Sequence, residues 1–224
     1  MIKAVPLRLR ILAALAAIFI ALAYLFAWSP VFTVKTITTS GVPAGVSSKS
    51  IIERSAVEVG DKLARIEPRS IEKLLGETSW VKSSSVSRNW MKGVVAIAIS
   101  ARVPVGIYKG RAIDSSGRLF DFPGEKVKDL PTVSAATPDL GLAAISLFSK
   151  LPSDLRKSLI SMSATSNSSI NSWHQELGRN IKINWGSADK IELKVSVYRA
   201  LLALPENKLI RRVDLSAPHA PIVK

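Results

Sequence analysis

Residues 80–103, WVKSSSVSRNWMKGVVAIAISARV, contain two strand-like segments joined by a short connection. Val94–Val103 is rich in β-branched residues, as strands are, and Trp80–Arg88 is predicted to be a second strand. The five residues between them, 89–93, are few enough for a hairpin loop and end in glycine. The stretch therefore predicts two antiparallel strands.

Upstream of this hairpin the pattern predicts one more strand and two helices. Phe32–Thr39 is β-branched and ends at a Ser-Gly pair, which is typical of a strand. Ser48–Val59 is a predicted helix in which Ser50 and Glu53 have the spacing of a capping box. Arg69–Leu75 is a second helix that follows a proline. The order strand, helix, helix, strand, strand predicts two helices on one face of a three-stranded sheet.

Pro104 marks a candidate boundary, and residues 104–224 are predicted to form a second, larger domain. The predicted fold class is α+β. A mixed α/β domain built on a mainly antiparallel sheet is expected after the first module. The predicted strands are Val105–Tyr108, Arg111–Asp114, Arg118–Phe120, Ser158–Ala164, Ser172–Leu177, Ile181–Trp185, Ile210–Leu215 and Pro221–Val223. The predicted helices are Leu140–Leu151 and a segment from Ser187 to about Leu204.

At the other end of the chain, residues 11–28 carry no charge. We expect a cytoplasmic tail over residues 1–10 and a single transmembrane helix over 11–30, with the rest of the chain exported, because basic residues before the run resist translocation. A cleaved signal peptide is the alternative, since Ala21-Leu22-Ala23 is an acceptable cleavage pattern. The residues expected to anchor the chain in the membrane are Ile11, Leu15, Phe19, Leu22, Leu25 and Trp28.

Composition excludes several classes of chemistry. The chain has no cysteine, so it has no disulfide framework, thiolate metal site or cysteine nucleophile. The net charge of +14 would suggest nucleic acid in a cytoplasmic protein. For an exported domain, anionic lipids or acidic polymers are the candidate counterparts, and a merely solvated surface is the simpler interpretation.

The sequence offers no catalytic constellation. The two histidines, His174 and His219, stand far apart, and we expect His174 to be an exposed or hydrogen-bonded strand residue rather than a base. Asp114 falls in a turn, where its side chain can accept backbone hydrogen bonds. No zinc, nucleophile-elbow or phosphate-loop motif occurs. We therefore expect neither an enzyme nor a bound cofactor or metal.

The last residues of the chain suggest binding instead. A final strand followed by Pro218 and Pro221 is typical of a sheet edge, because proline cannot donate to a strand ladder. An exposed edge can accept a strand from a partner. The alternative is that this segment only closes the sheet. Arg211 and Arg212 lie beside the edge and would either steer an acidic partner or simply end the strand in solvent.

Several segments, taken in their order and spacing, resemble the FtsQ/DivIB family of cell-division proteins, and actinobacterial members above all. The segments are Phe32-Thr33-Val34 before Gly41, residues 60–63, Trp80-Val81, residues 86–90, 97–105, 113–120, Leu130-Pro131, Trp185-Gly186, residues 192–194 and 213–218.

This resemblance implies a βααββ POTRA domain over residues 31–103 and a β domain over 104–224 whose C-terminal edge docks a partner. It also implies a non-enzymatic, single-pass scaffold of the divisome in the cell membrane at the septum. Its partners would be FtsB/DivIC-like and FtsL-like division proteins, with no nucleic acid and no small-molecule substrate. The alternatives are a secreted or tethered basic envelope-binding protein and a POTRA-type transport component. The docking positions that the resemblance implies are Ser216, Ala217, Pro218, His219 and Ile222.

Overall fold

A computed structural model describes residues 6–27, 31–124, 129–176 and 178–224. The chain divides into two compact units, Met1–Ala101 and Arg102–Lys224. The sequence placed this boundary slightly later, at Pro104.

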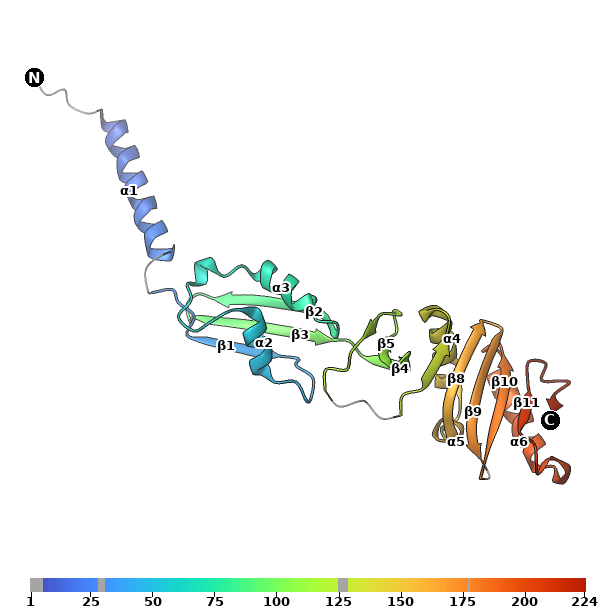
Figure 1. The fold of residues 1–224 in the computed structure, drawn as a ribbon. Coiled ribbons are helices and arrows are strands. Elements are labelled where there is room, and N and C mark those ends of the chain that lie inside the picture. The colour runs from blue at the N-terminus through green and yellow to red at the C-terminus, as the bar shows by residue number, and fades with distance from the viewer. Residues whose placement is uncertain (1–5, 28–30, 125–128, 177) are drawn as a thin grey trace, which may run out of the picture. The chain divides into compact units, whose positions relative to one another are not determined.

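The first unit contains the predicted strand, helix, helix, strand, strand order (Figure 1). In its sheet, ordered β1-β3-β2, β1 runs parallel to β3, and β2 and β3 form the predicted antiparallel hairpin. The described elements are α1 (Leu7–Ala27), β1 (Thr36–Ser40), α2 (Ser48–Ser55), the 3-10 turn η1 (Leu63–Arg65), α3 (Pro68–Gly76), β2 (Val81–Asn89) and β3 (Val94–Ala101).

Helix α2 starts at the predicted Ser48 but differs from its prediction in its capping and in its end. Its N-cap is Ser47, whose hydroxyl accepts a hydrogen bond from the Lys49 N–H, so the predicted capping box of Ser50 and Glu53 is wrong. The helix ends at Ser55, because Ala56 adopts a left-handed conformation with φ 53°. A residue in that conformation stops the helical hydrogen-bond pattern four residues before the predicted end.

The core of the first unit lies between its helices and its sheet. Glu72 of α3 accepts a 2.8 Å hydrogen bond from the backbone N–H of Val86, which ties this helix to β2. Gly41 adopts φ +71°, and a Cβ there would lie 2.0 Å from the Ile99 carbonyl oxygen, so only glycine fits. The buried apolar residues include Ile51, Leu63, Ile71, Leu75, Trp80, Val86, Val95, Ile97 and Ile99.

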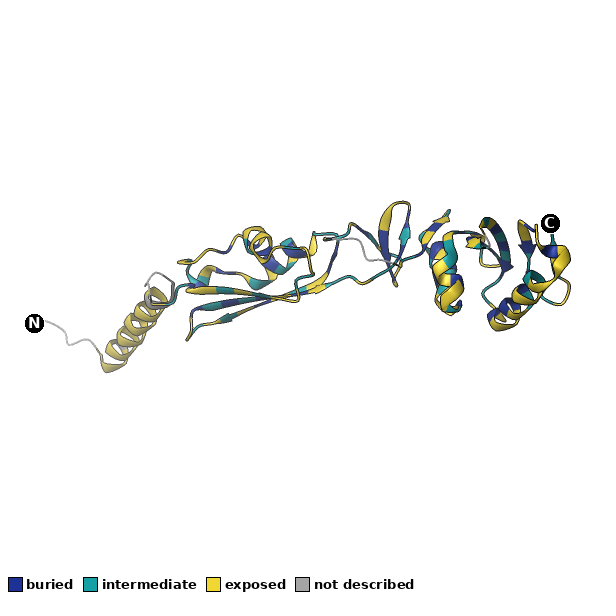
Figure 2. Ribbon diagram, turned by 90° about the horizontal axis from the view of Figure 1, so that it is seen from below, coloured by how far each residue is buried: buried dark blue, intermediate teal, exposed yellow. Residues whose placement is uncertain are grey.

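Helix α1 exposes the side chains that the structure describes along its length (Figure 2). Among the described residues, no helix is both long enough and apolar enough to cross a membrane. The predicted transmembrane helix over residues 11–30, and the membrane topology based on it, are therefore not supported. The helix begins at Leu7, before the uncharged run, so Arg8 and Arg10 belong to it rather than to a separate tail.

The second unit contains a mixed sheet with three helices. Its strand order is β12-β11-β10-β9-β8-β7-β4-β5-β6. Five neighbouring pairs are antiparallel and three are parallel, so the predicted mainly antiparallel sheet is confirmed. The described elements are β4 (Pro104–Tyr108), β5 (Arg111–Asp114), β6 (Leu119–Phe120), β7 (Thr132–Ala135), α4 (Pro138–Lys150), α5 (Ser153–Ser158), β8 (Leu159–Ser166), β9 (Ser169–Glu176), β10 (Arg179–Gly186), α6 (Ile191–Ala203), η2 (Pro205–Asn207), β11 (Arg212–Asp214) and β12 (Ile222–Val223).

Helices α4 and α6 share one apolar core with the sheet. Trp185 of β10 is fully buried and lies with its ring centroid 6.5 Å from that of Tyr198 on α6. A Cβ on Gly141 of α4 would lie 3.0 Å from the Tyr108 ring, so the helix packs closely on β4. Helix α6 starts at Ile191 and not at the predicted Ser187.

The turn after β5 is held by Asp114, as the sequence predicted. Its Oδ1 accepts hydrogen bonds from the N–H groups of Ser116 and Arg118, and its Oδ2 lies 2.8 Å from Arg102 Nη1. Burial opposes ionisation, but the Ser116 hydroxyl, Arg102 and the two backbone N–H groups lower the pKa of Asp114 to about 2. The carboxylate therefore stays ionised and joins the first residue of the unit to the β5–β6 turn.

Candidate partner-docking edge

The two-residue strand β12 is the terminal strand of the nine-stranded sheet, next to β11 (Figure 1). Lys224 and Arg212 exchange two backbone hydrogen bonds, each 2.9 Å long. Opposed residues of an antiparallel pair alternate between bonded and non-bonded, so Val223, opposite Val213, directs its N–H and C=O away from β11. In the part of the chain that the structure describes, no strand pairs with β12 on that side.

Asp214 holds the chain where it leaves β11. Its Oδ1 accepts hydrogen bonds from the Ser216 N–H (2.9 Å) and hydroxyl (2.6 Å), and its Oδ2 accepts one from Asn184 Nδ2 (2.9 Å). Burial opposes ionisation, but these hydrogen bonds lower the pKa of Asp214 below its usual value. The start of the turn is therefore tied to both β10 and β11.

The backbone of β10 lies close to the turn that follows β11. Gly186 adopts φ +67°, and a Cβ there would lie 2.9 Å from Ser216 Cα. The segment around Gly186 is held by Lys194 Nζ, which donates to the carbonyl oxygens of Trp185 (2.6 Å) and Ser187 (2.9 Å). Burial lowers the pKa of this nearly inaccessible lysine, and Asp189 partly opposes the shift.

The predicted docking residues lie together on this turn and strand. The Ala220 N–H donates to the Ala217 carbonyl, so the segment between β11 and β12 folds into a turn with Pro218 at its second position. Within it, Ser216, Ala217 and His219 are exposed and Pro218 is half-buried. The side chain of Ile222 is 57% exposed at the edge itself.

Arg211 and Arg212 direct their side chains to solvent while their backbone N–H groups donate to the Lys224 carbonyl. Leu209, two positions before Arg211, is 86% exposed and was not among the predicted site residues. The available signal was a leucine between Lys208 and the predicted strand Ile210–Leu215. Ile222, 57% exposed, is the apolar side chain of the edge strand itself.

The residues that were expected to anchor the chain lie on α1 or beyond it. Ile11, Leu15, Phe19 and Leu22 are exposed on this helix. Leu25 belongs to the helix, and Trp28 lies outside the described residues.

A buried polar cluster is the arrangement in the second unit that comes nearest to catalytic geometry. Ser158 Oγ lies 3.1 Å from His174 Nδ1 and 3.2 Å from Glu176 Oε1. The other ring nitrogen of His174 lies 2.7 Å from Ser172 Oγ, which accepts a hydrogen bond from Trp185 Nε1. Of the two predicted alternatives, the hydrogen-bonded strand histidine is confirmed and the exposed one is wrong, because His174 is completely buried.

The electrostatics of this cluster favour a structural role. Burial lowers the pKa of His174 to about 4, opposed by a hydrogen bond with the Leu155 backbone. A base with so low a pKa takes up a serine proton poorly at neutral pH. The ring is oriented by a serine hydroxyl, whereas an activating base is normally oriented by a carboxylate. Among the described residues, no group of three or more acidic or histidine side chains could hold a metal ion.

Each of the two compact units matches the model of a known protein family. The family model described as Cell division protein FtsQ/DivIB, C-terminal, matches residues 101–216. The chain belongs to the FtsQ/DivIB family. A second model, POTRA domain, FtsQ-type, matches residues 32–100, so the two matches meet at the boundary between the two compact units.

Curated relatives of this FtsQ/DivIB chain carry the name Cell division protein FtsQ. The Mycobacterium leprae protein is 26% identical over 206 residues, which cover 88% of this chain and 57% of that protein. The Shewanella oneidensis protein is 25% identical over 150 residues, or 65% of this chain and 56% of that protein. The Actinobacillus pleuropneumoniae protein is 23% identical over 157 residues, or 64% of this chain and 68% of that protein. The chain thus matches little more than half the length of the first two.

Proposed function

We propose that this FtsQ/DivIB chain is a non-enzymatic scaffold of the bacterial divisome, acting at the division septum. Membership of a cell-division family supports the process, and the exposed C-terminal edge supports the mode of action. The observation that carries the proposal is Val223, whose backbone N–H and C=O point outward from the last strand of the sheet.

The proposed partners are the small FtsB/DivIC-like and FtsL-like division proteins. A strand from an FtsB/DivIC-like partner would add to β12 through backbone hydrogen bonds, which give affinity without requiring a particular sequence. Side chains of the turn, from Ser216 to His219, together with Ile222 would then select the partner. Arg211 and Arg212 would steer an acidic segment of that partner toward the edge.

Replacing Val223 by proline tests this mode of binding. Val223→Pro removes the outward N–H and leaves the sheet hydrogen bonds of Lys224 in place. Val223→Thr is the matched control, because it keeps that N–H and a β-branched side chain. Both variants, and a chain ending at residue 215, would be titrated with the soluble part of an FtsB/DivIC-like partner.

We expect Val223→Pro to weaken binding at least tenfold, corresponding to about 1.4 kcal/mol for a lost edge hydrogen bond. Val223→Thr should bind like the wild type, and removal of residues 216–224 should abolish binding. Equal affinities for the wild type, Val223→Pro and the shortened chain would refute docking at this edge.

A further inference from the structure

The nine-stranded sheet has a second face, opposite the one that carries the core. Val133, Met162, Ser172, Ile183 and Val213 are cross-strand partners in successive strands, and all are buried. Side chains alternate between the two faces of a strand, so the residues on either side of these five point to the opposite face. They are exposed or half-buried in the structure.

One row of side chains on this second face has four neighbouring hydroxyls and amides and continues to Asp214 of β11, whose carboxylate is bonded to Asn184 and Ser216. Ser134 of β7 is paired with Ser163 of β8, Ser163 with Asn171 of β9, and Asn171 with Asn184 of β10. Because neighbouring strands lie about 4.8 Å apart, this row of four extends over roughly 14 Å. Each member can donate and accept hydrogen bonds, and the Asn184 amide already bonds to Asp214 and to the Gly186 N–H.

A parallel row contains an aromatic ring and a cation. Ser161 is paired with Trp173, and Trp173 is paired with Lys182. The Lys182 ammonium lies 5.1 Å from the centroid of the Trp173 ring, a cation–π distance. The indole is therefore held in place by its neighbour on β10.

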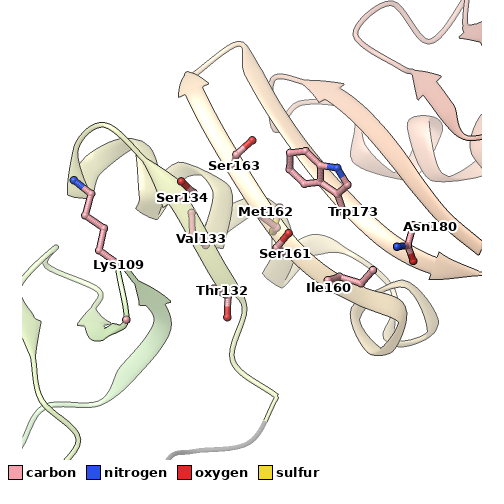
Figure 3. A pocket seen from close by; sticks show the side chains of 11 residues that line it. Lys109, Thr132, Val133, Ser134, Ile160, Ser161, Met162, Ser163, Trp173 and Asn180 are labelled. Atoms are coloured by element: carbon pink, nitrogen blue, oxygen red, sulfur yellow. The ribbon is translucent and has the colours of Figure 1, made fainter.

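The Trp173 ring also lines a depression of about 520 Å³ on this face. Figure 3 shows the ring extending from β9 toward β8, with Ser161 and Ser163 beside it. Lys109 contributes to the lining from the β4–β5 turn, and among the described residues that line the depression none is acidic. The depression thus combines a ring, hydroxyls and positive charge with the apolar side chain of Ile160, which is 48% exposed.

This chemistry does not suit a protein helix or a second sheet. Such partners bury apolar side chains, and desolvating rows of hydroxyls and amides without new hydrogen bonds is costly. A chain of sugars satisfies both requirements, because its hydroxyls pair with polar side chains while its C–H faces lie against an indole. Lys109 in the lining and Lys182 beside the Trp173 ring favour sugars that carry negative charge.

We propose that this face of the β domain binds an acidic glycan. One sugar ring stacks on Trp173, neighbouring hydroxyls bond to Ser163 and Asn171, and carboxylates lie near Lys109 and Lys182. The site does not include β12 or the turn from Ser216 to His219, although Lys182 is the cross-strand partner of Arg212 on β11.

The test measures binding of two oligosaccharides to the full chain by calorimetry and tryptophan fluorescence. The acidic probe is a hexasaccharide of alternating glucuronate and N-acetylglucosamine, and the neutral probe is cellohexaose. The variants are Trp173→Ala, Trp173→Phe, Ser163→Asp and Lys182→Gln. Lys157→Gln, at an exposed position on α5, is the matched control for loss of one positive charge.

We expect the acidic hexasaccharide to bind more tightly than cellohexaose and to change tryptophan emission. Trp173→Ala should weaken binding about tenfold or more, whereas Trp173→Phe should retain most of it. Ser163→Asp should abolish binding of the acidic probe while leaving the indole in place. Lys182→Gln should reduce affinity severalfold and reduce its dependence on salt, and Lys157→Gln should change neither.

The proposal is overturned if the wild-type chain does not bind the acidic probe at millimolar concentration. It is also overturned if Ser163→Asp and Trp173→Ala, each with a native circular dichroism spectrum, bind this probe like the wild type. Tighter binding of cellohexaose than of the acidic probe would contradict the acidic class.

Discussion

His174 Nε2 lies 2.7 Å from Ser172 Oγ, two residues earlier on the same buried face of β9. This contact joins the imidazole to Trp185, while Ser158 links the other ring nitrogen to Glu176 and α5. Glu176 in turn accepts a hydrogen bond from the Tyr198 hydroxyl of α6. The cluster thus ties two helices to the centre of the sheet.

The first prediction concerns acid stability. The pKa of His174 is about 4 in the folded chain and about 6.5 when unfolded. The unfolded chain therefore binds more protons between these values, so stability is full above pH 6.5 and falls as pH drops toward 4. The expected loss is up to about 3 kcal/mol in the free energy of unfolding. Urea unfolding followed by circular dichroism across this pH range measures it.

His174→Gln should be less stable at neutral pH and should lose most of this pH dependence. His219→Gln is the matched control, because His219 is exposed on the turn after β11. An unchanged pH dependence in His174→Gln would contradict the assignment.

The second prediction concerns the Arg102–Asp114 pair, whose side chains are 11% and 10% exposed. Asp114→Asn removes the charge facing Arg102 and weakens the turn, which should lower the free energy of unfolding by roughly 2–3 kcal/mol. The exposed Arg111–Asp121 pair provides the control, since Asp121→Asn should cost less than about 1 kcal/mol. Thermal melts of both variants compare the two pairs, and equal losses would show that burial of the first pair is unimportant.

Acid titration tests the same carboxylate in another way. The pKa of Asp114 is about 2 when folded, below its value of 3.8 in a free chain. Its contribution to stability is therefore complete above about pH 4 and is lost as pH falls toward 2. Asp114→Asn should lack this part of the acid unfolding profile, which a profile identical to that of the wild type would contradict.

The third prediction concerns the approach of Gly186 to Ser216. Gly186→Ala places a methyl group 2.9 Å from Ser216 Cα in a left-handed backbone, so either the turn or β10 has to shift. We expect a loss of roughly 2 kcal/mol in stability together with weaker partner binding. Gly110→Ala also lies at positive φ but meets no atom within 4 Å, so only the conformational cost should remain. If both variants lost the same stability and neither affected binding, the contact would not shape the turn.

The fourth prediction concerns association rate. Arg211→Glu reverses an exposed charge beside β12, so the association rate of an acidic partner should fall severalfold, and adding salt should reduce the difference. Lys157→Glu makes the same charge change on α5 and should leave the rate near that of the wild type. Stopped-flow measurements at two salt concentrations make the comparison. Matching rates for Arg211→Glu and the wild type at both concentrations would exclude steering.

Much of the fold could be predicted because its signals are local. The hairpin of β2 and β3 follows from two strand-like segments separated by a short loop, and α3 starts where Pro68 stands at the first helical position. Helix ends were predicted less well. Lys190, in a left-handed conformation, precedes α6, although Ser187 stood at a plausible cap position. The Ser187 carbonyl is instead taken by the buried Lys194, a contact that no local pattern indicates.

In the candidate site too, features that depend on neighbouring residues could be predicted, and contacts between residues far apart in the sequence could not. The amino-acid sequence alone determined the final strand, its prolines and the arginines beside it, because these depend on residues close together in the chain. Only the tertiary structure decided that β11 lies beside β10, which brings Asn184 to Asp214 and Gly186 to Ser216. Residues thirty positions apart meet there because the order of the strands in the sheet decides which strands are neighbours. Strand propensity does not decide this order, because it is set by burial of the whole core.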